Sequence, residues 1–217
     1  MTLKNILFTI SLLLIGATFS CRPDKPVDRE AVKQEMESRE LKRVSEVDLM
    51  AKGDQIGRES LEVIESTFQT QLKTAVAKEG IAGAISFCNL NAMDIVKKLE
   101  DSLGISIKRV TDKPRNPADS LSGIEKEIWE AYAYSPQNGS AQIQELNKTA
   151  LIYTKPIMIN TGLCLSCHGE VDQEITKENH SLIQQLYPDD MAIGYKVGDL
   201  RGMWRLIIPK KVAVDQL

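Results

Sequence analysis

The residues whose types and spacing best suit chemistry are a short run near the C-terminal end, Cys164-Leu165-Ser166-Cys167-His168. Cysteines three apart on a helical turn project to one side, and a histidine four residues after the first stays on that side. In an exported protein this C-x-x-C-H pattern is typical of c-type haem attachment, with both thiols bonded to one porphyrin. The imidazole then binds the iron, and its other ring nitrogen is expected to donate to a backbone carbonyl. The pattern therefore predicts one covalent haem c per chain.

Two other kinds of site use closely spaced cysteines. A thioredoxin-like redox pair belongs in a βαβ context, and a zinc site needs a second pair of Cys or His ligands at short spacing. Apart from Cys21 near the N-terminus, only Cys88 and His180 are left over as ligand candidates. Because these two do not supply a second pair, the haem interpretation is favoured.

The N-terminus indicates export, which c-type haem attachment also requires. Lys4 precedes an apolar run over residues 6–19, and Ser20-Cys21 follows. This run is shorter than the roughly 20 apolar residues of a membrane span, which favours a secretory signal. Cys21 directly after it resembles the lipidated first residue of a bacterial lipoprotein, although the bulky Phe19 departs from the usual pattern. Plain cleavage and an uncleaved anchor are the alternatives.

The chain is predicted to have three parts. Residues 1–21 form the signal peptide, residues 22–50 form a tether with two prolines and a charged helix, and residues 51–217 form one domain. The 27 basic and 30 acidic residues give a net charge of -3, which argues against a nucleic-acid-binding surface. We therefore expect a protein on the periplasmic side, held at the membrane through a lipid anchor on Cys21.

Periodicity predicts the elements of the domain. Apolar residues at helical spacing favour helices over residues 61–76, 81–99, 124–134 and 174–186, with Glu79-Gly80 ending the first. Period-two alternation and β-like composition favour strands over residues 105–110, 150–159 and 203–208, and Pro156 indicates an edge or a bulge. Residues 31–50 show a weaker helical pattern. These elements predict an α+β fold, with helices packed on a small antiparallel sheet.

Cys88 is the thiol without an evident role. It lies on the apolar face of the predicted 81–99 helix, where a free cysteine behaves as a small hydrophobic residue. It could equally face the iron as an axial thiolate opposite His168. Competing axial ligands are Met158, His180, Met191 and Met203.

Six short motifs together resemble a bacterial family of domains that carry a single c-type haem in a PAS-like fold. The resemblance covers roughly residues 55–210. Its motifs are Ala84-Ile85-x-x-Cys88, Ile107-Lys108-Arg109 with Pro114-Arg115-Asn116-Pro117, Lys155-Pro156-Ile157, Cys164 to Gly169, Gly194-Tyr195, and Gly198-Asp199-x-Arg201-Gly202. In that family the iron is held by the motif histidine and a cysteine on an earlier helix. The resemblance thus implies axial ligation by His168 and Cys88.

Two arginines are further candidates for contact with the haem. Arg109 shares a strand face with Ile105 and Ile107, and a buried guanidinium there would find bidentate partners in the haem propionates. The alternative is that Arg109 reaches outward at a sheet edge. Arg115 in the proline-rich loop is a second candidate, although loop arginines are usually solvated.

These residues predict a protein that senses redox state or gas, or passes electrons to a redox or signalling partner. A thiolate ligand favours ferric iron and gives a lower potential than His/Met ligation. With both axial positions filled, a gas would bind only by displacing a ligand. One alternative is a surface lipoprotein without haem, its C-x-x-C pair closed as a disulfide. Another is a peroxidase-like enzyme, but the only candidate distal histidine is His180, so we expect no enzyme.

Overall fold

The computed structural model describes residues 28–38, 44–90, 92–135 and 139–217, in two compact units, Met1–Arg43 and Val44–Leu217. In the first unit, helix α2 (Arg29–Ser38) begins after Asp28, whose carboxylate accepts hydrogen bonds from the next turn. The predicted signal peptide, Cys21 and nearly all of the polar tether lie outside the described residues. Within the described ranges, every helix is too short or too polar to span a bilayer.

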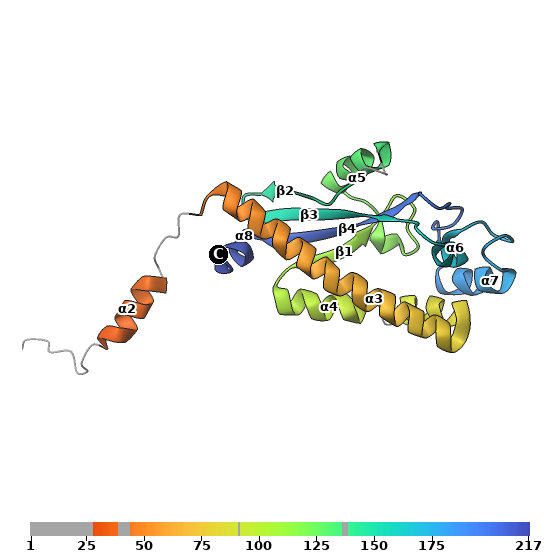
Figure 1. The fold of residues 1–217 in the computed structure, drawn as a ribbon, viewed down its shortest axis with the longest axis horizontal. Helices are drawn as coiled ribbons and strands as arrows, with labels where there is room; N and C mark the ends of the chain where they lie inside the picture. Colours follow the sequence, from red (N-terminus) through yellow and green to blue (C-terminus); the bar gives the residue numbers. More distant parts are fainter. Residues whose placement is uncertain (1–27, 39–43, 91, 136–138) are drawn as a thin grey trace, which may run out of the picture. The chain divides into compact units, whose positions relative to one another are not determined.

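The second unit is built on a four-stranded antiparallel sheet in the order β1-β4-β3-β2 (Figure 1). The strands are β1 (Ser106–Val110), β2 (Gln142–Asn147), β3 (Ala150–Met158) and β4 (Leu200–Pro209). Pro156 lies on β3 beyond Thr154, the last residue of this strand that pairs with β2, and opposite Met203 of β4. The sequence predicted an edge or a bulge at this proline; β3 is an inner strand, and its pairing with β4 shifts register between Ile157 and Met158.

Side chains alternate between the two faces of the sheet and build two cores. Ile107, Tyr153 and Leu206 face α3 (Glu46–Leu90), α4 (Ala92–Leu103) and α8 (Lys210–Asp215). Val110, Ile152 and Met203 face α5 (Ile124–Tyr134) instead. Figure 1 shows α5 across the sheet from α3 and α4. The predicted α+β class, with helices packed on a small antiparallel sheet after an N-terminal helix, is confirmed.

Helix α3 changes direction at the predicted stop. Glu79 and Gly80 have non-helical backbone angles, and Gly80 adopts φ 65° and ψ -159°. Glycine alone visits that region readily because it has no Cβ. The part of α3 after Gly80 can therefore run in a different direction from the part that packs on the sheet. This change of direction places Cys88 away from the core of the sheet.

Two predicted helices are wrong in extent. The pattern over residues 31–50 belongs to α2, which ends at Ser38, and to the start of α3, where Ser45 and Asp48 form a reciprocal cap. The predicted 81–99 helix is divided between α3 and α4, because its apolar residues serve two cores. Ile85 packs with α7 (Lys177–Leu186), whereas Val96 packs on the sheet. Strand β2 and helix α8 were not predicted.

Candidate functional site

The motif cysteines and histidine lie on one short helix, α6 (Gly162–His168), as predicted. Thr161 precedes it, with its carbonyl accepting from Cys164 N at 3.1 Å and its hydroxyl 3.4 Å from Cys164 Sγ. Gly169 ends the helix by donating to Leu165 O at 2.8 Å. A Cβ at Gly169 would lie only 2.8 Å from that same oxygen, so glycine permits the tight ending directly after His168.

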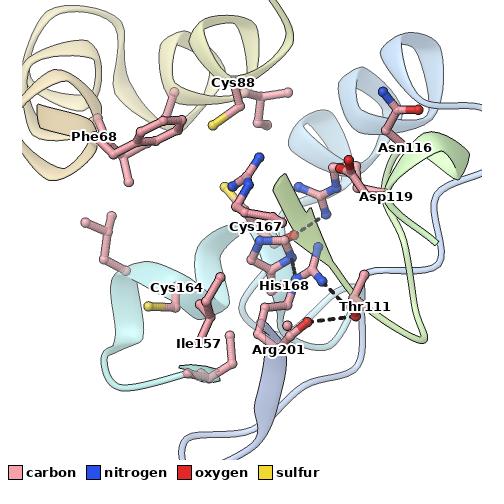
Figure 2. A pocket seen from close by; sticks show the side chains of 18 of the residues that line it. Phe68, Cys88, Thr111, Asn116, Asp119, Ile157, Cys164, Cys167, His168 and Arg201 are labelled. Atoms are coloured by element: carbon pink, nitrogen blue, oxygen red, sulfur yellow. Dashed lines mark hydrogen bonds between the residues drawn. The ribbon is translucent and has the colours of Figure 1, made fainter. Parts of the chain in front are cut away.

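This helix opens onto a cavity of about 320 Å³, a volume within the range of small-molecule sites. Cys164, Cys167 and His168 line it together with Cys88, which the turn at Gly80 brings from α3. Much of the remaining wall is apolar, including Phe68, Leu72, Val76, Ile85, Ile157 and Ile159. Figure 2 shows Cys88 and Phe68 on one side of this space and α6 on another. The structure therefore brings all four predicted ligand residues to one apolar cavity.

The imidazole of His168 is held by a backbone carbonyl, as expected for an iron ligand. Its Nδ1 lies 2.8 Å from the carbonyl oxygen of Ala192, an atom that can only accept. The proton is therefore on Nδ1, which leaves the lone pair of Nε2 for a metal. Arg201 Nε lies 3.3 Å from the same Nδ1. Because a protonated nitrogen cannot accept, we assign this second approach as a charge contact and not as a hydrogen bond.

Charge and burial keep this imidazole neutral. Burial, together with the positive charges of Arg201 and Arg115, holds the pKa of His168 well below its usual range. The neutral form is the one that binds metals. Residues after α7 fix the backbone as well, since Tyr195 N donates to His168 O at 2.9 Å and Gly194 N donates to Gly169 O at 2.8 Å. We call α6 and residues 190–195 the proximal wall.

Arg115 braces the proximal wall and is not a solvated loop residue. Its Nε and Nη2 each lie 3.1 Å from an oxygen of Asp190, and both side chains are largely buried. The same Nη2 donates to Cys167 O at 2.6 Å and to Ala192 O at 3.3 Å. Asp190 in turn accepts from Ala192 N at 2.8 Å. Arg115 lines the cavity, but its hydrogen bonds position the motif helix and the carbonyl that holds His168.

Cys88 lies across the cavity on the segment of α3 that follows the turn. We call residues 81–88 the distal wall. Burial raises the pKa of the Cys88 thiol, with Arg109 and Arg115 acting in the opposite direction. Of the competing axial ligands, Met158 also lines the cavity. Met203 is fully buried in the core under α5, Met191 is 55% exposed, and His180 is not among the lining residues.

Arg109 lies on the edge strand β1, yet its side chain also lines the cavity. Its guanidinium carbon is 5.5 Å from the ring centre of Phe68 and 5.8 Å from that of Trp204, within cation–π range. Arg109 is exposed on this edge strand, as the second alternative expected, and its contact with haem propionates stays a prediction.

Several site residues were missed by sequence reasoning. Arg201 was noticed only as part of a glycine-rich motif, although its side chain contacts the His168 ring. Tyr195 packs edge-on to that ring at 6.2 Å. Asp119, from the 3-10 turn η2 (Pro117–Asp119), lines the cavity too. No sequence signal singles out Arg201, because its contact with His168 joins residues that are 33 positions apart.

The three described cysteines are free, but their thiols differ. Burial raises the pKa of Cys167 to about 11. Burial would also raise the pKa of Cys164, but hydrogen bonds from the Thr161 hydroxyl and nearby backbone amides outweigh it and lower the pKa. Two thiols and an imidazole on one wall, a thiol opposite and apolar surroundings form a donor set that fits a porphyrin with its iron.

Comparison with known proteins gives one family. A family model described as Tll0287-like matches residues 29–209. A solved structure, described as the cyanobacterial haem protein Tll0287, is 28% identical with a TM-score of 0.47, and the alignment covers 54% of this chain and 69% of that one. No curated protein matches the sequence. Because the family model spans well over half of the residues, the chain belongs to the Tll0287-like family.

Proposed function

We propose that this chain binds one haem c, bonded through the thiols of Cys164 and Cys167, with Nε2 of His168 as an axial ligand. The observation that carries the proposal is the contact of 2.8 Å between His168 Nδ1 and Ala192 O. It fixes the ring and leaves Nε2 unprotonated beside two free thiols. Membership of a family named for a protein that is described as a haem protein supports the same ligand.

The second axial ligand in this proposal is the thiolate of Cys88. Its sulfur belongs to the wall facing α6, and among the other candidates only Met158 shares the cavity. A bound ferric iron would stabilise the thiolate, offsetting the burial that raises the pKa of this thiol. Cys88→Ser should change the ferric absorption and spin-resonance spectra, whereas Met158→Leu should leave them unchanged. The reverse result would assign the position to Met158.

The proposed role is redox or gas sensing, or electron transfer, without enzymatic turnover. A haem with both axial positions filled supplies a one-electron couple, and a diatomic gas must displace a ligand to reach the iron. The sequence further supports export by the segment before Cys21 and anchoring by a lipid at that residue. The partner is then a redox or signalling protein on the same side of the membrane.

The experiment is haem staining of the denatured protein after expression in a host that exports it and attaches c-type haem. The wild-type chain should keep its stain, and replacing both Cys164 and Cys167 by serine should abolish it. Cys88→Ser is the matched control, because it removes a cavity thiol that forms no thioether. An unstained wild-type band, with Cys164 and Cys167 joined as a disulfide, would overturn the proposal in favour of a lipoprotein without haem.

A further inference from the structure

Three arginines line the cavity, and their partners differ sharply. Arg115 is neutralised by the bidentate pair with Asp190 and has short hydrogen bonds besides. Asp119 is the only carboxylate on the lining, and no ion pair of its side chain is found among the described residues. The cavity therefore carries an excess of positive charge on its own wall.

Arg201 is the clearest case of a guanidinium without a counter-ion. Its Nη1 lies 3.4 Å from Thr111 Oγ1 and 3.4 Å from Lys113 O, both neutral acceptors. These distances exceed the usual 2.7–3.2 Å of N–H···O hydrogen bonds. In the described parts of the chain, no carboxylate forms an ion pair with it. Its guanidinium also contacts the ring of Tyr195, whose centre lies 5.4 Å from the guanidinium carbon, and an aromatic face does not neutralise a charge.

Arg109 is the second guanidinium on the lining for which no ion pair is found among the described residues, although its side chain is exposed. Its recorded contacts are the faces of Phe68 and Trp204, and none of the described carboxylates pairs with it. Aromatic faces attract a cation but do not neutralise it. Two guanidiniums on one cavity wall thus call for a ligand that brings negative charge, and planar carboxylates suit them best.

Resting on the proposed haem function, we propose that Arg201 and Arg109 bind the two propionate carboxylates of the porphyrin and thereby set its orientation in the cavity. The two thiols bond to the vinyl-bearing part of the macrocycle, and the propionates project from its other half. In Figure 2 the His168 ring lies between Cys164 and Arg201. The thioether bonds and the carboxylate contacts would then hold the macrocycle from two sides of its axial imidazole.

The test compares two probes that differ only in this charge, ferric haem and its dimethyl ester, on the haem-free full mature chain. Dissociation constants are measured by absorption titration. Because esterification removes the negative charge from both hydrogen-bonded pairs, the ester should bind the wild-type chain at least about 10-fold more weakly than haem. In Arg201→Gln and Arg109→Gln this preference for haem should shrink, and in the double variant it should vanish.

Lys108→Gln is the matched control, because it removes one positive charge from the neighbouring position of β1, whose side chain points away from the cavity lining. It should keep the wild-type preference. Equal binding of haem and ester to the wild-type chain would overturn the propionate contacts while leaving haem binding intact. Failure of the wild-type chain to bind either probe, or to acquire covalent haem in the exporting host, would overturn the proposed function as well. The wild-type comparison requires no variant to fold.

Discussion

The two walls of the cavity are built from different interactions. On the proximal wall, Arg115 and Tyr195 N donate hydrogen bonds to the backbone of α6, and Asp190 accepts from Ala192 N, whose carbonyl holds the ring of His168. On the distal wall, Ile81 and Ile85 pack on α7 and on Cys167, and no hydrogen bond of the Cys88 thiol is recorded among the described residues. The proposed proximal ligand, His168, is thus preorganised by directional bonds, while the proposed distal ligand, Cys88, is placed by apolar packing and by the turn at Gly80.

This difference indicates which ligand can be exchanged. Hydrogen bonds fix the orientation of a side chain, whereas apolar packing keeps a side chain buried but tolerates small shifts in its position. A ligand held only by packing moves at lower cost when the iron changes its oxidation state. We therefore expect displacement by a gas or by redox change to occur at Cys88, with His168 retained.

The largest expected effect comes from removing the proximal imidazole of the haem-loaded protein. His168→Gly should abolish the six-coordinate low-spin spectrum entirely, because no other described side chain on that wall offers a nitrogen ligand. Added imidazole should restore it, with the haem still bonded to the cysteines. A wild-type spectrum in this variant would show that His168 is not the ligand. Cys88→Ser should change the spectrum less. The added ligands that restore its wild-type spectrum should differ from those that restore the spectrum of His168→Gly.

The next effect concerns the ion pair that supports the proximal wall. Asp190→Ala leaves the largely buried guanidinium of Arg115 unpaired and should lower the free energy of unfolding by roughly 3–5 kcal/mol. Asp101→Ala is the control, because it breaks an exposed pair with Lys97 and should cost under about 1 kcal/mol. Urea unfolding of both variants measures the contrast. Similar losses would remove the distinction between a structural pair and a surface pair.

A moderate effect is expected at the turn that positions the distal wall. Gly80→Ala forces a side chain into backbone angles that glycine adopts, at a cost of about 1–3 kcal/mol. It should also broaden the ferric spectrum as Cys88 loses its fixed position. Gly162→Ala in the motif helix lies in open space and should change stability by about 0.5 kcal/mol or less. A neutral Gly80→Ala would mean that the turn does not depend on glycine.

The smallest effect is the titration of the thiols in the haem-free chain. Burial raises the pKa of Cys167 from 9.0 to about 11, so the folded chain binds more protons than the unfolded chain between these values. The free energy of unfolding should therefore fall as the pH rises from about 9 to about 11, and Cys167→Ser should flatten this part of the curve. Alkylation near neutral pH should reach Cys164 first, because its pKa is lowered. Faster modification of Cys167 would contradict both expectations.

Much of the site could be predicted because its chemistry is local in sequence. The spacing of Cys164, Cys167 and His168 predicts a helical turn with one reactive side, and α6 has that form. The need for a backbone carbonyl at the imidazole was also predicted. Which carbonyl would serve could not be, because the oxygen of Ala192 carries no residue signature.

The remaining features depend on contacts between distant segments. Arg115 looks like an ordinary loop arginine until Asp190 is placed beside it. The helix predicted over residues 81–99 contains two apolar stripes that pack in different cores, and a sequence pattern cannot separate them. The one local signal against a single helix is the pair Asn89 and Asn91, since asparagine favours turns. The strand β2 was missed because it forms an edge of the sheet and its sequence, QIQELN, is mostly polar.

The most direct test of the central claim is peptide mass analysis of the mature chain from an exporting, haem-attaching host. After proteolysis, the peptide that contains residues 164–168 should carry the added mass of one haem, with Cys88 unmodified in its own peptide. Cys164 and Cys167 found free or joined to each other, with no porphyrin mass on that peptide, would contradict covalent haem binding by this protein.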